Sequence, residues 1–448
     1  MSNFIYLIAW IILPILLEFI PTFYNFLCLL KKKMTIKNDV KLQFYPDISI
    51  IIPVYNSAKT LEACIRSINE SNYNNNSIEV IIIDNGSKDN SFKIFQDCQI
   101  KYPNLAMNWM TSEQGKSKAL NKALFNANGK YIINIDSDGW LEKNALNNLI
   151  YRFETDKNIN CLTGTILIEP KLIEETPKLG LKIFRRLEFM EYCQAFLASR
   201  NYESETNSIY TLSGAFSAFR KSTILKTQLY NTNTICEDTH LTYQVKTLLK
   251  QKVGLCENAL FFVDPIDNFD KFYTQRQRWQ IGELEVNHMF FRDSLDESVV
   301  KLLKKREIRL LLLDHTFSFP KMIWYFAMIA LCIINYSLNS LLVFMGVLYI
   351  LYTINAFLYF FNVIGFLEKF PNIRKYYISN WVYLFIFPAY NFVSFFVRLA
   401  GITNSINRQS SWKTNTLTEE KKIVEDTIND DFKEVSKVQK GIRKIMEK

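Results

Sequence analysis

Long apolar stretches lie at both ends of this 448-residue chain, and the part between them alternates short apolar runs with amphipathic ones. Phe4 to Leu30 is almost free of charge, and further apolar stretches crowd the segment from about Phe317 to Leu399. About 20 apolar residues suffice to cross a bilayer. We therefore predict a retained transmembrane anchor in residues 1–33 and membrane segments in residues 317–400.

The middle of the chain has the pattern of an α/β fold. The expected strands are Ile48–Val54, Ile78–Asp84, Leu105–Met110, Lys130–Asp136, Cys161–Ile168, Tyr210–Phe219 and Val253–Val263. The expected helices are Lys59–Glu70, Ser91–Tyr102, Lys116–Phe125, Leu181–Ala198, Asp238–Leu249 and Phe269–Phe291. Uninterrupted runs such as Val80–Ile83 indicate strands covered on both faces, so we predict a doubly wound, mostly parallel sheet in residues 45–292. The polar stretch Asn201–Ser208 is expected to be a loop that can move over the cleft.

Basic residues set the expected orientation in the membrane. Lys31, Lys32 and Lys33 follow the first apolar stretch, so the middle domain is predicted to lie in the cytoplasm of a multi-pass cell-membrane protein. The net charge of +9 suits anionic lipid and anionic ligands better than nucleic acid. Residues 298–316 are predicted to form an amphipathic helix on the membrane surface, and residues 401–448 a charged tail. The number of C-terminal spans, and so the side of the tail, stays open.

Eight cysteines are scattered without CxxC spacing, and three histidines lie far apart. Neither a disulfide framework nor a zinc site is indicated.

Three acidic positions follow apolar runs, where a parallel sheet presents side chains to a ligand. Asp84 ends one expected strand, and Asp136 and Asp138 follow another. A pair of carboxylates at this spacing suits Mg²⁺ or Mn²⁺, which also binds phosphate oxygens. By itself the Asp-x-Asp pattern more often has a structural role, because surface turns are rich in aspartate.

Glu237 and Asp238 stand at the expected start of a helix. Either carboxylate could cap free backbone amides there, or could take a proton from an attacking hydroxyl. Lys116 likewise could attract a nucleotide or belong to a solvated helix face.

A basic, aromatic cluster lies on the last expected helix of the middle domain. Gln275, Arg278 and Trp279 share one face at helical spacing. They could form a packed face with a snorkelling arginine, or bind a diphosphate and a sugar.

Taken together, these motifs resemble those of membrane-bound family 2 glycosyltransferases of the GT-A fold, of the processive type that includes hyaluronan, cellulose and poly-N-acetylglucosamine synthases. In size the chain is also similar to an exosortase-associated branch in Gram-positive bacteria. The motifs that carry the resemblance are Pro53-Val54-Tyr55-Asn56, Ile83-Asp84-Asn85-Gly86-Ser87, Gly115-Lys116-Ser117-Lys118-Ala119-Leu120-Asn121, Asp136-Ser137-Asp138, Ser213-Gly214-Ala215, Glu237-Asp238 and Gln275-x-x-Arg278-Trp279. Two positions depart from the family pattern: Asn85 replaces an aspartate, and Cys236 replaces a threonine.

The resemblance implies an inverting transfer of a sugar from a nucleotide-sugar donor, favoured to be a UDP-sugar, to a growing glycan. Asp238 would be the base with Glu237 beside it, and Asp136 and Asp138 would hold Mg²⁺ or Mn²⁺. The residues implied in substrate binding are Pro53, Tyr55, Asn56, Asp84, Lys116, Asp136, Ser213, Gly214, Gln275, Arg278 and Trp279. Two alternatives stay open: transfer of one sugar to a polyprenyl phosphate or other membrane lipid, and a non-enzymatic assembly scaffold.

Overall fold

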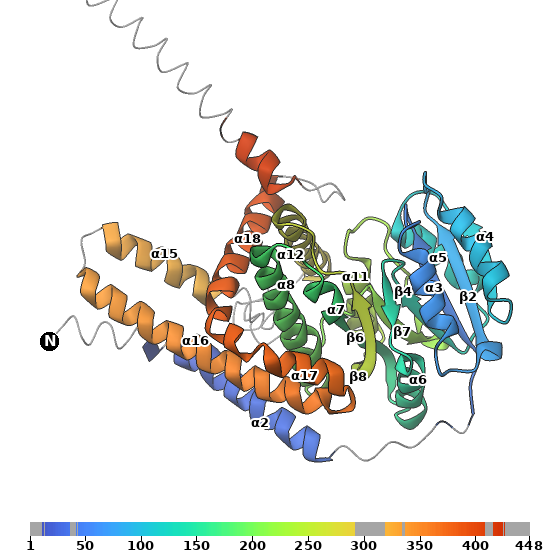
Figure 1. Cartoon of the computed structure of the whole chain (residues 1–448), viewed down its shortest axis with the longest axis horizontal. Helices are drawn as coiled ribbons and strands as arrows, with labels where there is room; N and C mark the ends of the chain where they lie inside the picture. The colour runs from blue at the N-terminus through green and yellow to red at the C-terminus, as the bar shows by residue number, and fades with distance from the viewer. Residues whose placement is uncertain are drawn as a thin grey trace, which may run out of the picture.

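The computed structural model combines a mixed α/β domain with a layer of long apolar helices at its far end (Figure 1). It describes residues 11–12, 14–35, 42, 44–291, 319–333, 337–407, 415–423 and 425. The predicted surface helix at 298–316 and most of the tail at 401–448 lie outside the described residues.

Eight strands form one sheet in the order β3-β2-β1-β4-β7-β6-β8-β5. The strands are β1 (Ile48–Val54), β2 (Ile78–Asp84), β3 (Ala106–Thr111), β4 (Tyr131–Ile135), β5 (Gly139–Leu141), β6 (Ile159–Ile168), β7 (Phe216–Arg220) and β8 (Lys252–Val263). The first four pair in parallel, β7 runs antiparallel between β4 and β6, and β6 pairs in parallel with β8. The loops after β1, β2 and β4 therefore meet the loop before β7 at one edge of the sheet.

Alternate residues of β1 face two different helix layers. Ile50 and Ile52 pack in one apolar cluster with α3 and α4, whereas Ile51 packs in another with α5. This arrangement explains the uninterrupted apolar runs in the sequence, since both faces of the parallel strands are covered.

The six predicted helices of the α/β domain are present in the predicted order, and within residues 44–291 the structure adds four helices that were not predicted. The helices are α3 (Leu61–Asn69), α4 (Ser91–Lys101), α5 (Lys116–Asn126), α6 (Ala145–Thr155), α7 (Pro170–Glu174), α8 (Leu179–Tyr192), α9 (Arg200–Glu205), α10 (Lys221–Ile224), α11 (Glu237–Tyr243) and α12 (Phe269–Phe291), with a 3₁₀ turn at Asn75–Ser77. Two π-helical segments, Cys193–Ser199 and Gln244–Leu248, continue α8 and α11.

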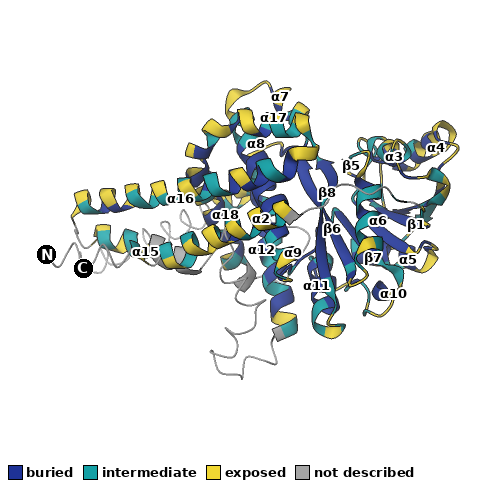
Figure 2. Ribbon diagram, turned by 90° about the horizontal axis from the view of Figure 1, so that it is seen from below, coloured by how far each residue is buried: buried dark blue, intermediate teal, exposed yellow. Residues whose placement is uncertain are grey.

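The apolar layer contains helices from both ends of the chain. They are α2 (Ile20–Thr35), α15 (Phe319–Ile333), α16 (Leu338–Phe366), α17 (Pro371–Ser379) and α18 (Phe387–Asn407), with a π-helical segment at Ile15–Phe19 and 3₁₀ turns at Leu367–Lys369 and Trp381–Phe385. Among the described residues, one helix, Leu338–Lys369, is long and apolar enough to cross a membrane. Large apolar side chains are exposed along α16 and α2. Figure 2 colours many residues of these two helices as exposed.

Buried polar contacts join the apolar layer to the α/β domain. Arg276 of α12 is fully buried and pairs with Glu191 of α8 at 2.6 Å, and Glu191 also accepts a 2.6 Å hydrogen bond from Tyr390 of α18. Near the middle of α8, Arg186 donates a 2.7 Å hydrogen bond to the Tyr383 hydroxyl. The apolar helices are therefore fixed to the domain through specific charges as well as apolar contacts.

The second half of the domain departs from the prediction in two places. The stretch Asn201–Ser208, predicted to be a mobile loop, is mostly the buried helix α9, so that prediction is wrong. Asn201 accepts a hydrogen bond from Lys32, and Ser204 accepts one from the Leu255 N–H. The predicted strand Tyr210–Phe219 is shorter, because its first half is an irregular extended segment before β7.

Candidate active site

The strand order changes direction between β1 and β4, and the loops after these two strands touch. The Ser57 and Ser137 hydroxyls lie 2.7 Å apart. The Asp136 N–H donates to the Ala215 carbonyl at 3.1 Å, which brings the segment before β7 to the same place. A change of direction in strand order opens a crevice at the strand ends, which is the usual ligand site of such sheets.

Lys116 stands at the centre of this crevice. Its Nζ lies 2.6 Å from Asp136 Oδ1 and 3.5 Å from Glu237 Oε1. Burial opposes its positive charge, but Asp136, Glu237 and Asp238 outweigh that effect and raise the pKa of Lys116. The interpretation of Lys116 as part of a solvated helix face is therefore wrong.

Asp238 is held by two backbone donors. The Gly214 N–H donates to one carboxylate oxygen at 2.9 Å, and the Thr239 N–H donates to the other at 2.7 Å. A β-carbon at position 214 would lie 2.9 Å from Asp238 Oδ2, so only glycine allows this close approach. The motif Ser213-Gly214 thus positions the carboxylate, while Ser213 itself donates its N–H to Thr163 Oγ1.

Burial raises the pKa of both adjacent carboxyl groups. For Glu237 the pKa is about 7, because burial and the nearby charge of Asp238 outweigh the attraction of Lys116. The pKa of Asp238 is also raised by burial, against the influence of Lys116 and of two backbone N–H groups. Strongly perturbed carboxyl groups at the ligand edge of such a sheet are candidates for a catalytic site.

Residues 49–226 match the protein-family model described as glycosyl transferase family 2. This stretch of the chain is therefore similar to family 2 glycosyltransferase domains. Lys116, Asp136 and Gly214 lie inside the match, whereas Glu237, Asp238 and Arg278 lie beyond its end.

Curated relatives of this chain include two bacterial polysaccharide synthases. The poly-β-1,6-N-acetyl-D-glucosamine synthase of Staphylococcus epidermidis is 26% identical over 243 residues, which are 53% of this chain and 55% of the relative. The corresponding Staphylococcus aureus synthase is 24% identical over 254 residues, which are 56% of this chain and 58% of the relative. The chain thus spans little more than half the length of these relatives.

A solved structure confirms the fold. A mannosyltransferase from Pyrobaculum calidifontis, in complex with GDP-Man and Mn²⁺, superposes with a TM-score of 0.57 at 17% identity and covers 86% of this chain and 98% of its own. The predicted mixed, mostly parallel GT-A sheet with helices on both faces is therefore correct, although the predicted transmembrane helices at both ends are not confirmed by it.

The glycosyltransferase motifs after β1 and β2 are joined to each other. The Asn56 side chain accepts the Lys88 N–H at 2.8 Å, and Asp84 accepts the Ser87 N–H at 2.9 Å. The unusual Asn85 accepts a hydrogen bond from the Gly115 N–H, just before α5. Asn85 thus links the loop after β2 to the residue that precedes Lys116.

Two further predicted residues lie at the carboxyl end of β1. Pro53 is half-buried within the strand, and Tyr55, just after it, is exposed. Their contact with substrate stays a prediction.

Helix α12 brings its own motif to the carboxylate pair. Gly282 packs against Cys236, and one turn earlier Arg278 lies within electrostatic reach of Glu237 and Asp138. Burial lowers the pKa of Arg278, although these acidic groups act in the opposite direction.

The other two residues of the α12 motif surround Arg276. Gln275 accepts a 2.8 Å hydrogen bond from Arg276, whose guanidinium lies 4.4 Å from the centre of the Trp279 ring. Trp279 also packs edge-on against Phe196. Arg276 thus contacts both Gln275 and Trp279 and helps to fix their positions. The sequence did not indicate this role.

Asp136 and Asp138 supply two carboxylate ligands for a divalent cation, fewer than a complete protein site needs. Incomplete hydration and the charge of Asp136 raise the pKa of Asp138 to about 6, and a cation would relieve this repulsion. Within the described part of the chain, no group of three or more His, Cys, Asp or Glu side chains could hold a metal. A cation at this pair would therefore complete its shell with water and with phosphate oxygens of a donor.

Proposed function

We propose that this protein is an inverting glycosyltransferase that transfers a sugar from a nucleoside-diphosphate sugar to an acceptor hydroxyl. The observation that carries the proposal is the cluster of Lys116, Asp136, Glu237 and Asp238 at the carboxyl edge of the sheet, beside the segment that matches family 2. In it a buried carboxylate pair stands beside a cation, within one crevice.

Asp238 is the proposed base. The acceptor oxygen forms a bond to the anomeric carbon, the bond from that carbon to the diphosphate oxygen breaks, and the acceptor proton passes to Asp238. No covalent intermediate forms on the enzyme, so the anomeric configuration inverts. The N–H groups of Gly214 and Thr239 keep the carboxylate oriented and leave lone pairs for the proton.

The leaving diphosphate gains negative charge during transfer. Lys116 and Arg278 are the proposed cations that stabilise it, since both lie beside the carboxylate cluster. A Mg²⁺ or Mn²⁺ ion on Asp136 and Asp138 would supply further charge stabilisation. Asp84 is proposed to bind the nucleoside, and Gln275 and Trp279 the acceptor end.

The donor is proposed to be a UDP-sugar. UDP-N-acetylglucosamine is the first candidate, because the curated relatives are named for poly-N-acetylglucosamine synthesis. The acceptor is proposed to be a growing surface glycan. A polyprenyl phosphate or another membrane lipid is the alternative acceptor, and product length separates the two: a single addition excludes a polymerase.

A location at the cytoplasmic face of the cell membrane is proposed from the helical layer. The apolar helix Leu338–Lys369 and the exposed apolar residues of α2 support contact with lipid. The proposed domains are an anchor at 1–33, the transferase at 45–292, a surface helix at 298–316, membrane segments at 317–400 and a tail at 401–448.

Release of nucleoside diphosphate tests the proposal. Detergent-purified full-length protein is assayed with Mn²⁺ or Mg²⁺ against a panel of UDP- and GDP-sugars, beside the Asp138→Ala variant. Metal-dependent release from one donor, lost in the variant, supports the transferase. Folded protein that neither releases nor binds any nucleotide would instead favour a scaffold.

A further inference from the structure

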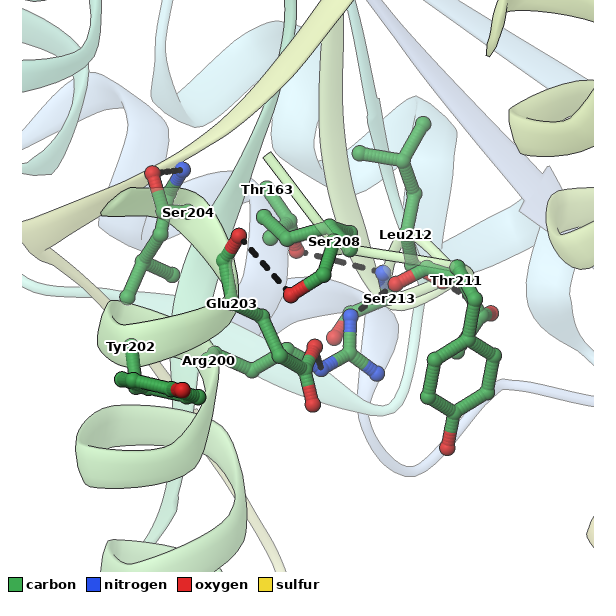
Figure 3. Close-up of polar contacts among 12 residues, drawn as sticks. Thr163, Arg200, Tyr202, Glu203, Ser204, Ser208, Thr211, Leu212 and Ser213 are labelled. Atoms are coloured by element: carbon green, nitrogen blue, oxygen red, sulfur yellow. Dashed lines mark hydrogen bonds and ion pairs between the residues drawn. The ribbon is translucent and has the colours of Figure 1, made fainter. Parts of the chain in front are cut away.

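Arg200, the first residue of α9, is buried beside the extended segment that precedes β7. Arg200 is 8% exposed. Its guanidinium donates a hydrogen bond to the Thr211 carbonyl, and its Nε lies 3.6 Å from Glu203 Oε2. Figure 3 shows the guanidinium between Glu203 and the Thr211–Ser213 segment. Burial of an arginine costs free energy unless its charge is paired or hydrogen-bonded. The contacts with Thr211 and Glu203 offset this cost, and they fix Arg200 against the extended segment.

The extended segment before β7, residues 211–214, makes successive hydrogen bonds to α11. The Thr211 and Thr239 hydroxyls lie 2.7 Å apart, and the Leu212 N–H donates to Thr242 Oγ1 at 2.9 Å. Two residues later Gly214 donates to Asp238. A shift of this segment would therefore move the donor that orients the Asp238 carboxylate.

On its other side the same segment rests on β6. The Ser213 N–H donates to Thr163 Oγ1 at 3.1 Å, between the contact to Thr211 and the contact at Gly214. The segment is thus held from β6, α11 and α9 at once, and Arg200 supplies the contact from α9.

We propose that Arg200 is a positioning residue for the transfer reaction, which fixes Asp238 through Thr211, Thr239 and Gly214 and places a positive charge near the carboxylate. This inference rests on the proposed role of Asp238 as the base. It adds a residue outside the matched motifs, in a helix that sequence patterning did not reveal.

The charges near Asp238 come from three elements. Lys116 of α5 and Arg200 of α9 favour its ionised form, while the neighbouring Glu237 of α11 is a second carboxyl group in the cluster. Loss of Arg200 removes a cation that favours the ionised form of Asp238, so the apparent pKa of the base should rise.

Four variants separate charge from position. Arg200→Gln removes the charge and alters the hydrogen bonding, Arg200→Lys keeps the charge, and Thr211→Val removes only the hydroxyl bonded to Thr239. Arg220→Gln is the matched control, because Arg220 also donates to backbone carbonyls, those of Phe153 and Ile159, at the opposite end of β7.

The measurements are kcat/KM against pH, the donor KM and the Tm of each full-length variant. We expect Arg200→Gln to lower kcat roughly 10- to 100-fold and to move the acidic limb of the profile to higher pH, with donor KM within about twofold. Arg200→Lys should keep the limb, Thr211→Val should lower kcat with the limb in place, and Arg220→Gln should change Tm alone.

The inference would be overturned if Arg200→Gln kept the acidic limb of the wild-type profile of kcat/KM against pH and lost no more kcat than Arg220→Gln. If Arg200→Gln does not fold, Thr211→Val decides, since unchanged kcat in that variant contradicts the linkage. Turnover retained by Asp238→Asn would mean instead that the base assignment itself has failed. Loss of turnover in Asp238→Asn beside a normal Arg200→Gln would refute the role of Arg200 alone.

Discussion

Gly282 of α12 lies directly against Cys236, the residue before the carboxylate pair. A β-carbon at position 282 would come within 2.0 Å of Cys236 Sγ. Because Arg278 is one turn away on the same helix, this contact sets how closely the arginine approaches Glu237.

The first prediction concerns this contact. Gly282→Ala should push α12 away from α11, lower the free energy of unfolding by about 1–3 kcal/mol and reduce donor turnover. Gly180→Ala is the control, since a β-carbon at that helical position meets nothing within 4 Å. Thermal unfolding and nucleotide release are measured on both, and equal behaviour would show that the helices tolerate separation.

The second prediction concerns pH. Burial raises the pKa of Glu237 from 4.5 to about 7, so between these pH values the folded state binds more protons than the unfolded state. Stability from this group is therefore fully present below about pH 4.5 and is lost as pH rises through about 7.

The loss of stability between about pH 4.5 and pH 7 should appear as a fall in Tm. Glu237→Gln should reduce this fall by several degrees, since about 1 kcal/mol moves Tm by roughly 2–4 °C. Glu188→Gln is the comparison for stability, because burial also raises the pKa of Glu188 to about 7. Both variants should flatten the curve of Tm against pH. A Tm profile of Glu237→Gln parallel to that of the wild type would contradict the assigned burial.

The third prediction concerns the N-terminal helix. Lys32 is almost buried, and its Nζ lies 2.6 Å from Asn201 Oδ1 and 2.9 Å from Glu205 Oε1. Lys32→Met should destabilise the protein by about 1.5–3 kcal/mol and lower kcat, because Asn201 directly follows Arg200. Lys31→Met removes the same charge from an exposed position and should change neither quantity. Equal effects in the two variants would show that only the basic charge matters.

Much of the fold could be predicted from the sequence because the signals are local. Strands such as β1 and β2 are buried on both faces and appear as uninterrupted apolar runs, and Asp84 and Asp136 end or follow such runs. Parallel pairing then brings the strand ends together, which is why Asp84 and Asp136 could be assigned to one edge.

The parts that were missed depend on partners far away in the chain. Asn201 and Ser204 look like loop residues by polarity, but their hydrogen bonds come from Lys32 and from the Leu255 backbone. The central position of Lys116 likewise depends on Glu237, over 100 residues later. No periodicity within α5 or α9 could reveal these contacts.

The most direct test of the central claim compares donor binding with sugar transfer in Asp238→Asn. The purified full-length variant and the wild type are titrated with the active nucleotide sugar and then assayed for nucleoside diphosphate release in the presence of acceptor. The account predicts a donor Kd within about threefold of the wild type and a kcat lower by at least about 100-fold, since a positioned base contributes roughly 10²–10⁴ to the rate. Wild-type turnover in Asp238→Asn would contradict it.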